Sequence, residues 1–256
     1  MGDKIKKKGQ MTIFIIIAIV VVALGALIWQ FYPNIVPEVG LDTTNPQTFI
    51  QSCLEEDVES VVENLSLQGG SLEPVHFYLY DNEKIEYLCY NEEYYQTCIM
   101  QQPMLKNHIE SEIKKGISAQ VEACFDDLET SFEKKGYSVN LKKGGMSVEL
   151  LPKKIVVNIE NSLTLTKDGV EKYDSFDVIL NNNLYELVVI INSILNWEAR
   201  YGDAEVTVYM NFYHNLQIEK KKQTDGTTIY ILTERDSKNK FQFASRSLAW
   251  PAGISV

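Results

Sequence analysis

The sequence predicts an α+β protein in which an N-terminal transmembrane helix precedes a helix-hairpin-helix unit and an antiparallel sheet packed with one helix. Three observations support this class: an uncharged apolar run near the N-terminus, two stretches with apolar residues three and four apart, and an alternation of period two after residue 137. The chain has 256 residues, 45% of them hydrophobic and 23% charged, so it can form a core.

The charge distribution is uneven. The net charge is -11, from 24 Lys and Arg against 35 Asp and Glu, yet residues 1–9 alone contain four lysines. A nucleic-acid-binding protein needs a cationic surface to displace counterions from phosphates. We therefore expect no nucleic-acid partner and an acidic domain beyond residue 9.

Residues 10–32 are predicted to be the transmembrane helix. Met11 to Trp29 carry no charge and, as a helix, would span about 28 Å, against about 30 Å for a hydrocarbon core. A lone segment in lipid must satisfy its own backbone hydrogen bonds, which a helix does. The lysines before it place residues 1–9 in the cytoplasm as a basic leader, and the C-terminal domain outside at the cell surface. Membrane lipid is thus an expected partner.

The run Lys6-Lys7-Lys8-Gly9-Gln10, followed directly by the apolar segment, resembles the class III leader of archaeal type IV pilin-like proteins. The resemblance covers about the first 30 residues. It implies that a prepilin peptidase cuts between Gly9 and Gln10, that the apolar helix stays on the mature chain, and that other pilin-like subunits are partners. Assembling pilins carry Glu five residues into the mature chain, where this sequence has Phe14. Leader processing is therefore better supported than polymerisation.

Two other interpretations of the N-terminus stay open. In one, the segment is a plain signal anchor and the Gly-Gln pair has no role. In the other, a secretory signal peptidase cuts near Ala23-Leu24-Gly25, a small-x-small site. The apolar run continues to Trp29 instead of turning polar, which favours an uncleaved segment.

Residues 33–46 form a predicted Pro-rich stalk, and residues 47–136 a helical unit with a hairpin. Asn45-Pro46 is a typical helix start, and Gly69-Gly70 follows the end of the first apolar period. The exposed face of this helix is acidic, and we interpret it as solvated rather than as a cation site; its residues are Glu55, Glu56, Asp57, Glu59 and Glu63.

Aromatic-rich runs at 74–80 and 85–90 predict the hairpin. Pro103 opens a second helical pattern that ends at Lys134-Lys135-Gly136, with basic residues in the last turn. We expect Gly116 to kink this helix.

Residues 137–256 are predicted to be an α+β domain. Alternation predicts an antiparallel meander over 138–141, 146–151, 154–159 and 162–167. Apolar residues from Leu184 to Trp197 predict a helix that ends at Tyr201-Gly202 and covers one face of the sheet. Further strands are expected at 205–213, 216–222, 228–233 and 240–244, with a turn at Asp225-Gly226.

Four cysteines on the exterior side favour two disulfides. Cys89 with Cys98 is the local pairing, and Cys53 with Cys124 would then join the two helices of residues 47–136. Free buried thiols and a four-cysteine zinc site are the alternatives, and the zinc site lacks any Cys-x-x-Cys pair.

No catalytic signature occurs. His76, His108 and His214 are isolated, so packing or surface positions are expected, and the adjacent Asp126 and Asp127 point in different directions on a helix. We expect no enzyme, no cofactor and no metal site; Asn64 begins a glycosylation sequon whose use stays open. The predicted function is a membrane-anchored, pilin-like cell-surface subunit for assembly or adhesion, with minor and non-polymerising subunits included. The alternative is a permanently anchored binding or sensory ectodomain with no filament role.

Overall fold

The computed structural model of the chain describes Val22 and residues 45–251. The chain divides into two units, Met1–Leu41 and Asp42–Val256, and residues 45–251 belong to the second. The predicted leader, nearly all of the transmembrane segment and most of the stalk lie outside the described residues. Among the residues that are described, no helix has the length and apolar character needed to cross a bilayer.

Two packed helices open the described unit. Helix α2 (Pro46–Leu67) begins as expected, because the Asn45 side chain accepts a hydrogen bond of 2.8 Å from the Gln47 N–H and Pro46 is the first helical residue. Helix α3 (Leu105–Lys134) packs against it. A Cβ on Gly116 would lie 2.8 Å from the Val61 side chain, so this glycine allows the two helices to approach closely. Close approach of the two helices accounts for a glycine at this position.

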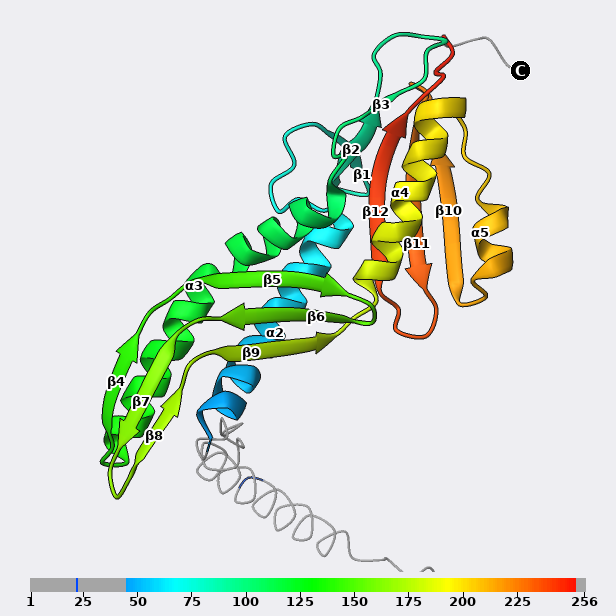
Figure 1. Cartoon of the computed structure of the whole chain (residues 1–256). Helices are drawn as coiled ribbons and strands as arrows, with labels where there is room; N and C mark the ends of the chain where they lie inside the picture. The colour runs from blue at the N-terminus through cyan, green and yellow to red at the C-terminus, as the bar shows by residue number, and fades with distance from the viewer. Residues whose placement is uncertain (1–21, 23–44, 252–256) are drawn as a thin grey trace, which may run out of the picture. The chain divides into compact units, whose positions relative to one another are not determined.

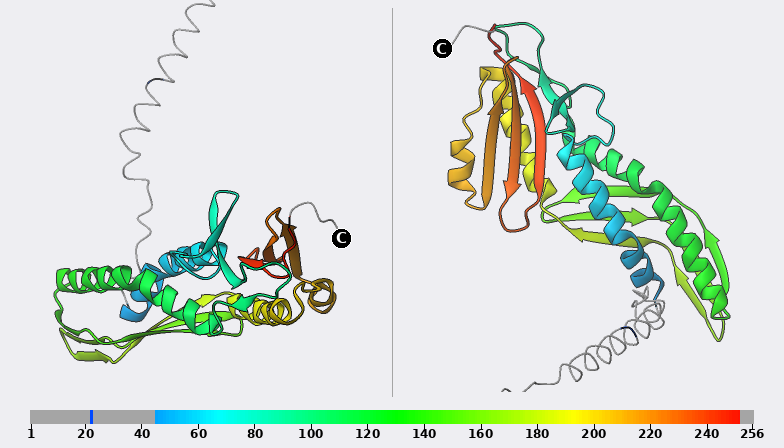
Figure 2. Two further views of the ribbon diagram at one scale, coloured as in Figure 1. Left: turned by 90° about the horizontal axis from the view of Figure 1, so that it is seen from above. Right: turned by 180° about the vertical axis from the view of Figure 1, so that it is seen from behind.

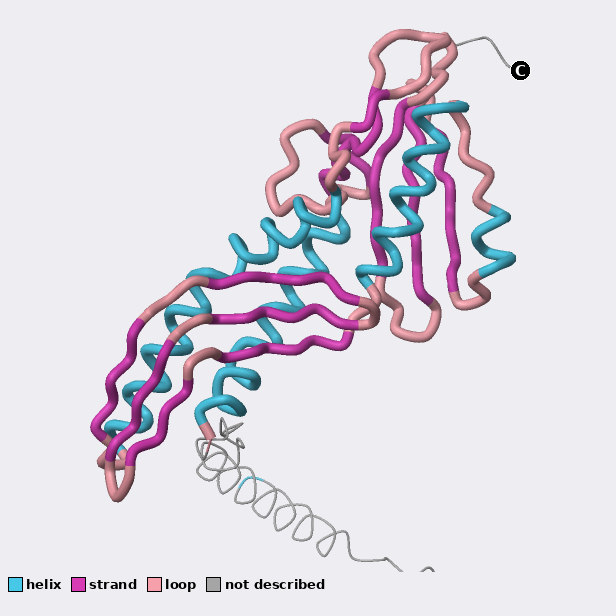
Figure 3. The backbone as a smooth tube through the Cα atoms, viewed as in Figure 1, coloured by secondary structure: helices cyan, strands magenta, loops and turns pink. Residues whose placement is uncertain are grey.

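Three long antiparallel strands lie against these helices, and each is interrupted by a bend (Figure 3). The six segments are β4 (Ser138–Lys142), β5 (Met146–Leu151), β6 (Lys154–Ile159), β7 (Ser162–Thr166), β8 (Val170–Tyr173) and β9 (Phe176–Asn181). They pair in the orders β4-β7-β8 and β5-β6-β9. The meander is therefore present, with one more long strand, β8 plus β9, than the sequence predicted. Figures 1 and 2 show α2 and α3 on one face of these strands.

Glycine makes the bend in the first strand sterically feasible. A Cβ at Gly144 would overlap the carbonyl oxygen of Glu160 on the neighbouring strand. The Gly144 N–H donates to Asn161 Oδ1 over 2.7 Å, and the Glu160 N–H donates to the Gly145 carbonyl over 2.8 Å. The chain thus keeps hydrogen bonds across the bend while the ladder changes direction.

A second, mixed sheet has the order β1-β2-β12-β11-β10, with β3 also paired to β2. Its strands are β1 (Phe77–Tyr80), β2 (Glu83–Tyr90), β3 (Ile99–Met100), β10 (Leu216–Lys222), β11 (Thr227–Glu234) and β12 (Lys240–Arg246). Strands β1 and β2 are antiparallel around Asp81 and Asn82, whose φ angles of 49° and 69° suit a tight hairpin turn. Strand β2 then pairs in parallel with β12.

The mixed sheet is covered on both faces. Helix α4 (Leu184–Tyr201) lies on one face, as predicted (Figure 1). On the other face, residues of β2, β11 and β12 form a buried cluster against which Tyr78 and Tyr80 of β1 pack. The Tyr78 hydroxyl also lies 3.5 Å from Gln223 Oε1 beyond β10. The β1-β2 hairpin therefore folds over the face opposite α4.

The structure changes three parts of the expected organisation. The segment predicted as a strand over 205–213 contains helix α5 (Thr207–Phe212), which packs along β10. The preference of a segment for a strand depends on packing against neighbouring strands. Residues 207–212 lie beside β10 as a helix and do not pair with it. Trp197, expected on the buried face of α4, is 44% exposed. Because β2 pairs with β12 and α3 packs on β5, residues on either side of the predicted boundary at 136/137 form one compact unit.

Candidate functional site

The predicted site residues fall into two groups. Gly9 and Gln10, the predicted leader cleavage site, lie outside the described residues. The four cysteines form two disulfides: Cys53 with Cys124 joins α2 to α3, and Cys89 with Cys98 joins β2 to the segment before β3. These are the two pairs that the sequence favoured. Within the described part of the chain, no group of three or more His, Cys, Asp or Glu side chains could hold a metal ion.

The three histidines lie in different settings. The ring of His76 packs against Tyr87 and Tyr90, with centroid distances of 4.7 and 4.3 Å, and His214 is exposed. Both therefore occupy the packing or surface positions expected for them. His108 differs, because it belongs to a polar cluster that the sequence analysis missed.

In this cluster, the Ser71 hydroxyl lies 2.7 Å from His108 Nε2 and 2.5 Å from Glu86 Oε2. Ser71 is buried, and burial raises the pKa of Glu86 above its usual value, although the hydrogen bond from Ser71 and the nearby imidazole lower it. A serine beside a histidine is a feature of nucleophilic catalysis, so the cluster is a candidate active site.

The geometry does not support that chemistry. In a serine hydrolase the carboxylate orients the histidine, and a backbone N–H near the serine binds the oxyanion. Here Glu86 contacts Ser71 instead of His108, and the N–H of Leu72 donates to Glu112 Oε2 over 2.9 Å. The cluster instead connects the end of α2, strand β2 and the start of α3. Gly69 allows α2 and β2 to approach closely beside the cluster, because its φ is 87° and a Cβ there would lie 2.8 Å from that of Glu86.

A second buried carboxylate organises the sheet covered by α4. Glu198, 2% exposed, receives hydrogen bonds from the Tyr230 hydroxyl, the Ala204 N–H over 2.8 Å and the Ser245 hydroxyl over 2.9 Å. Its backbone carbonyl accepts a further bond of 2.8 Å from the Ser247 hydroxyl. One side chain therefore holds together α4, the loop after it, β11 and β12.

The charge of Glu198 is only partly compensated. Burial raises its pKa, while its three hydrogen-bond donors and the ammonium group of Lys220 oppose that rise. The Lys220 Nζ donates to the Ala204 carbonyl over 2.8 Å and contacts Asp203. The three groups that contact the Glu198 carboxylate all donate hydrogen bonds to it. The carboxylate therefore acts as a hydrogen-bond acceptor that holds these groups in place. This arrangement stabilises the packing of α4 on the sheet, with the carboxylate buried.

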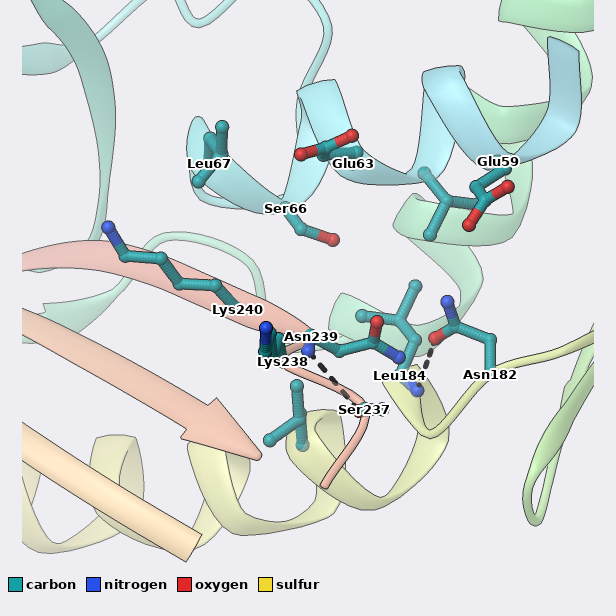
Figure 4. A pocket seen from close by; sticks show the side chains of 12 residues that line it. Glu59, Glu63, Ser66, Leu67, Asn182, Leu184, Ser237, Lys238, Asn239 and Lys240 are labelled. Atoms are coloured by element: carbon teal, nitrogen blue, oxygen red, sulfur yellow. Dashed lines mark hydrogen bonds between the residues drawn. The ribbon is translucent and has the colours of Figure 1, made fainter. Parts of the chain in front are cut away.

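A polar cavity of about 330 Å³ lies where α2, the start of α4 and the β11-β12 turn meet (Figure 4). Glu59 and Glu63 of α2 line it together with Lys238 and Lys240 from the turn and β12. Amide groups of Asn182 and Asn239 complete it on the side of α4 (Figure 4). The cavity offers charges of both signs, so it can hold a small polar group. Two residues of the acidic α2 face thus line a cavity in addition to meeting solvent.

No protein-family model, curated protein or solved structure matches the chain.

Proposed function

We propose that the chain is a membrane-anchored cell-surface protein whose acidic exterior unit serves surface assembly or adhesion as a pilin-like subunit. In this proposal residues 10–32 form the transmembrane helix, residues 1–9 are a cytoplasmic leader, and a prepilin peptidase cuts between Gly9 and Gln10. The observation that carries the proposal is the Lys-Gly-Gln leader directly before an uncharged apolar segment.

The exterior location has independent support. The described unit contains two disulfides, which persist in oxidising compartments and are rare in the cytoplasm. Its polar clusters are used for packing, and its surface is acidic. A binding or assembly role therefore agrees with the described unit better than an enzymatic role.

The mature N-terminus tests the proposal. Mass spectrometry of the protein purified from its native membrane should find an N-terminal peptide that begins at Gln10. A peptide that begins near Ala26 would contradict both membrane-bound interpretations and indicate a secreted protein.

One observation favours a second candidate function. Phe14 occupies the position where an assembling pilin carries Glu, so the charge pair between neighbouring subunits is missing. A permanently anchored binding or sensory ectodomain would not need that pair. An intact Lys-rich N-terminus in the same experiment would support this candidate.

A replacement of the apolar segment separates anchoring from assembly. Membrane insertion depends on summed hydrophobicity, whereas lateral packing of subunits depends on side-chain shape. A poly-Leu segment that keeps Lys8-Gly9-Gln10 should insert normally but should not be recovered in sheared surface filaments. If the natural chain is itself absent from that fraction, the filament role is wrong.

A further inference from the structure

Sheet edges expose unpaired backbone groups, and this chain covers several of its own. At β9, the Gln51 side chain accepts from the Ile179 N–H over 2.9 Å and donates to the Ile179 carbonyl over 3.1 Å. Gln47 donates to the Asp177 carbonyl over 2.6 Å on the same edge. At the opposite edge of that sheet, Glu110 Oε1 accepts from the Leu150 N–H over 2.8 Å. Both helices thus occupy edge positions where another strand would otherwise pair.

The remaining long edges are protected by other means. The N–H of Leu216 donates to the Tyr213 carbonyl over 2.9 Å and that of Ile218 approaches Met210 Sδ at 3.3 Å, so the start of β10 is covered by the α5 region. The rest of β10 carries lysines, and β4 and β8 carry Lys142, Glu171 and Lys172 at exposed positions. Charged side chains, lysine above all, discourage pairing at an edge.

Strand β1 has no helix over its edge and no charged residue of its own; the ammonium group of Lys84 on β2 lies 5.1 Å from the centre of the Phe77 ring and leaves the outer backbone groups uncovered. Tyr80 and Glu83 are the paired residues that flank the hairpin turn. At the other end of the hairpin, the Tyr87 N–H donates to the His76 carbonyl over 2.9 Å, so residues 76 and 87 are a hydrogen-bonded pair. Hydrogen-bonded positions alternate along an antiparallel pair, so the backbone groups of Phe77 and Leu79 point away from β2. Among the described residues, none forms a hydrogen bond with them.

The side chains at this edge are apolar and exposed. Phe77 and Leu79 lie on one face of β1 and are 37% and 61% exposed, and Val75, just before the strand, is 93% exposed. No residue of β1 is charged, whereas the chain as a whole carries a net charge of -11 and its α2 surface is acidic. The net negative charge opposes association of two copies in general, whereas two uncharged β1 strands add no charge repulsion of their own.

We propose that β1 pairs antiparallel with β1 of a second copy, centred on Tyr78, so that Phe77 of each copy lies opposite Leu79 of the other. The outward backbone groups of both residues then form main-chain hydrogen bonds, and each apolar side chain faces another across the new strand pair. The contact is two-fold symmetric. This contact goes beyond the proposed function, because only the exterior unit takes part in it. It would join two anchored chains as well as two neighbouring filaments.

Mixed cysteine variants of the full chain in detergent micelles test the register. In the proposed contact, residue 77 of one copy and residue 79 of the other are about 5.5 Å apart at Cα, within the range of a disulfide. Two copies of the same position lie on a diagonal of about 7–8 Å, which is too far. Mild oxidation should cross-link a mixture of the Phe77→Cys and Leu79→Cys chains and neither variant alone. Equal cross-linking in all three samples, or none in the mixture, would overturn the proposal.

A proline substitution tests the main-chain hydrogen bonds of the proposed contact without introducing cysteines. The Leu79 N–H points outward, so Leu79→Pro removes a donor of the open edge and leaves the β1-β2 ladder intact. Its matched control, Leu79→Thr, keeps the N–H and the strand preference. Sedimentation of the natural chain should show a dimer, retained by Leu79→Thr with weaker affinity and lost by Leu79→Pro, while circular dichroism stays unchanged. A natural chain that sediments only as a monomer, or a Leu79→Pro chain that still dimerises, would overturn the proposal.

Discussion

The described unit contains two regions that are stabilised in different ways. The helix-pair region comprises α2, α3 and β4 to β9, and its interior is apolar, with a disulfide between the helices. The mixed-sheet region comprises β1 to β3, α4, α5 and β10 to β12, and it has the buried carboxylate of Glu198 at its centre. Apolar contacts tolerate small displacements, whereas a buried carboxylate requires each donor in place. The mixed-sheet region should therefore be the more sensitive to a single polar substitution.

The largest effect is expected at Glu198. Replacement by Leu leaves the Ala204 N–H, the Tyr230 hydroxyl and the Ser245 hydroxyl without their acceptor, which should lower the free energy of unfolding by about 3–5 kcal/mol. The control Glu198→Gln keeps an acceptor oxygen and should cost less than about 1.5 kcal/mol. Urea unfolding of the full chain measures both. Equal losses for the two variants would mean that charge, and not hydrogen bonding, holds the region together.

Disulfide removal should affect the helix-pair region more. Cys53 and Cys124 are separated by 71 residues and Cys89 and Cys98 by 9. Chain entropy alone gives upper values of about 4.4 and 2.7 kcal/mol for the two bonds. Double Ser variants of each pair should therefore differ in urea midpoint in that order. Non-reducing peptide mapping of the native protein checks the pairing itself, and four alkylatable thiols would contradict it.

A larger side chain between α2 and α3 should have a smaller effect on stability. Gly116→Val places methyl groups against Val61 and should cost about 1–3 kcal/mol. Gly169→Val is the matched control, because nothing lies within 4 Å of a Cβ at that position. Thermal unfolding of both variants should show a clear loss only for Gly116. A neutral Gly116→Val would mean that α2 and α3 can separate without cost.

The smallest effect is expected from pH. Burial raises the pKa of both Glu198 and Glu86 above the usual value of 4.5. A carboxyl with a raised folded-state pKa favours the folded protein at low pH, and that stability is lost as the pH rises through the folded-state pKa. The free energy of unfolding should therefore decrease as the pH rises above 4.5, and the decrease should be smaller in Glu198→Gln. A slope that the substitution leaves unchanged would assign the effect to Glu86 or to other groups.

Local chemistry made several elements predictable from the sequence. Asn45 and Pro46 mark the start of α2 because capping depends on adjacent residues. The strands from β4 to β7 follow from alternation and short turns, which need no distant partner. The pairing of Cys89 with Cys98 follows from proximity in the chain, and the second disulfide follows by elimination.

The Ser71 cluster, the cavity beside α2 and the open edge of β1 could not be read from the sequence, because each depends on which strands and helices become neighbours. Strand β2 pairs with β12, more than 150 residues away in the chain, so β1 becomes part of a larger sheet only through this long-range contact.

The contrast is clearest on α4. Hydrophobicity placed Trp197 on the buried face of α4, but the structure leaves Trp197 44% exposed and buries its neighbour Glu198. Helical periodicity did contain the signal, since position 198 follows Ile191, Ile194 and Leu195 on one face. A sequence alone determines which positions share a helical face. Whether a carboxylate can be buried there depends on donors such as Tyr230 and Ser245, which only the tertiary structure brings within hydrogen-bonding distance.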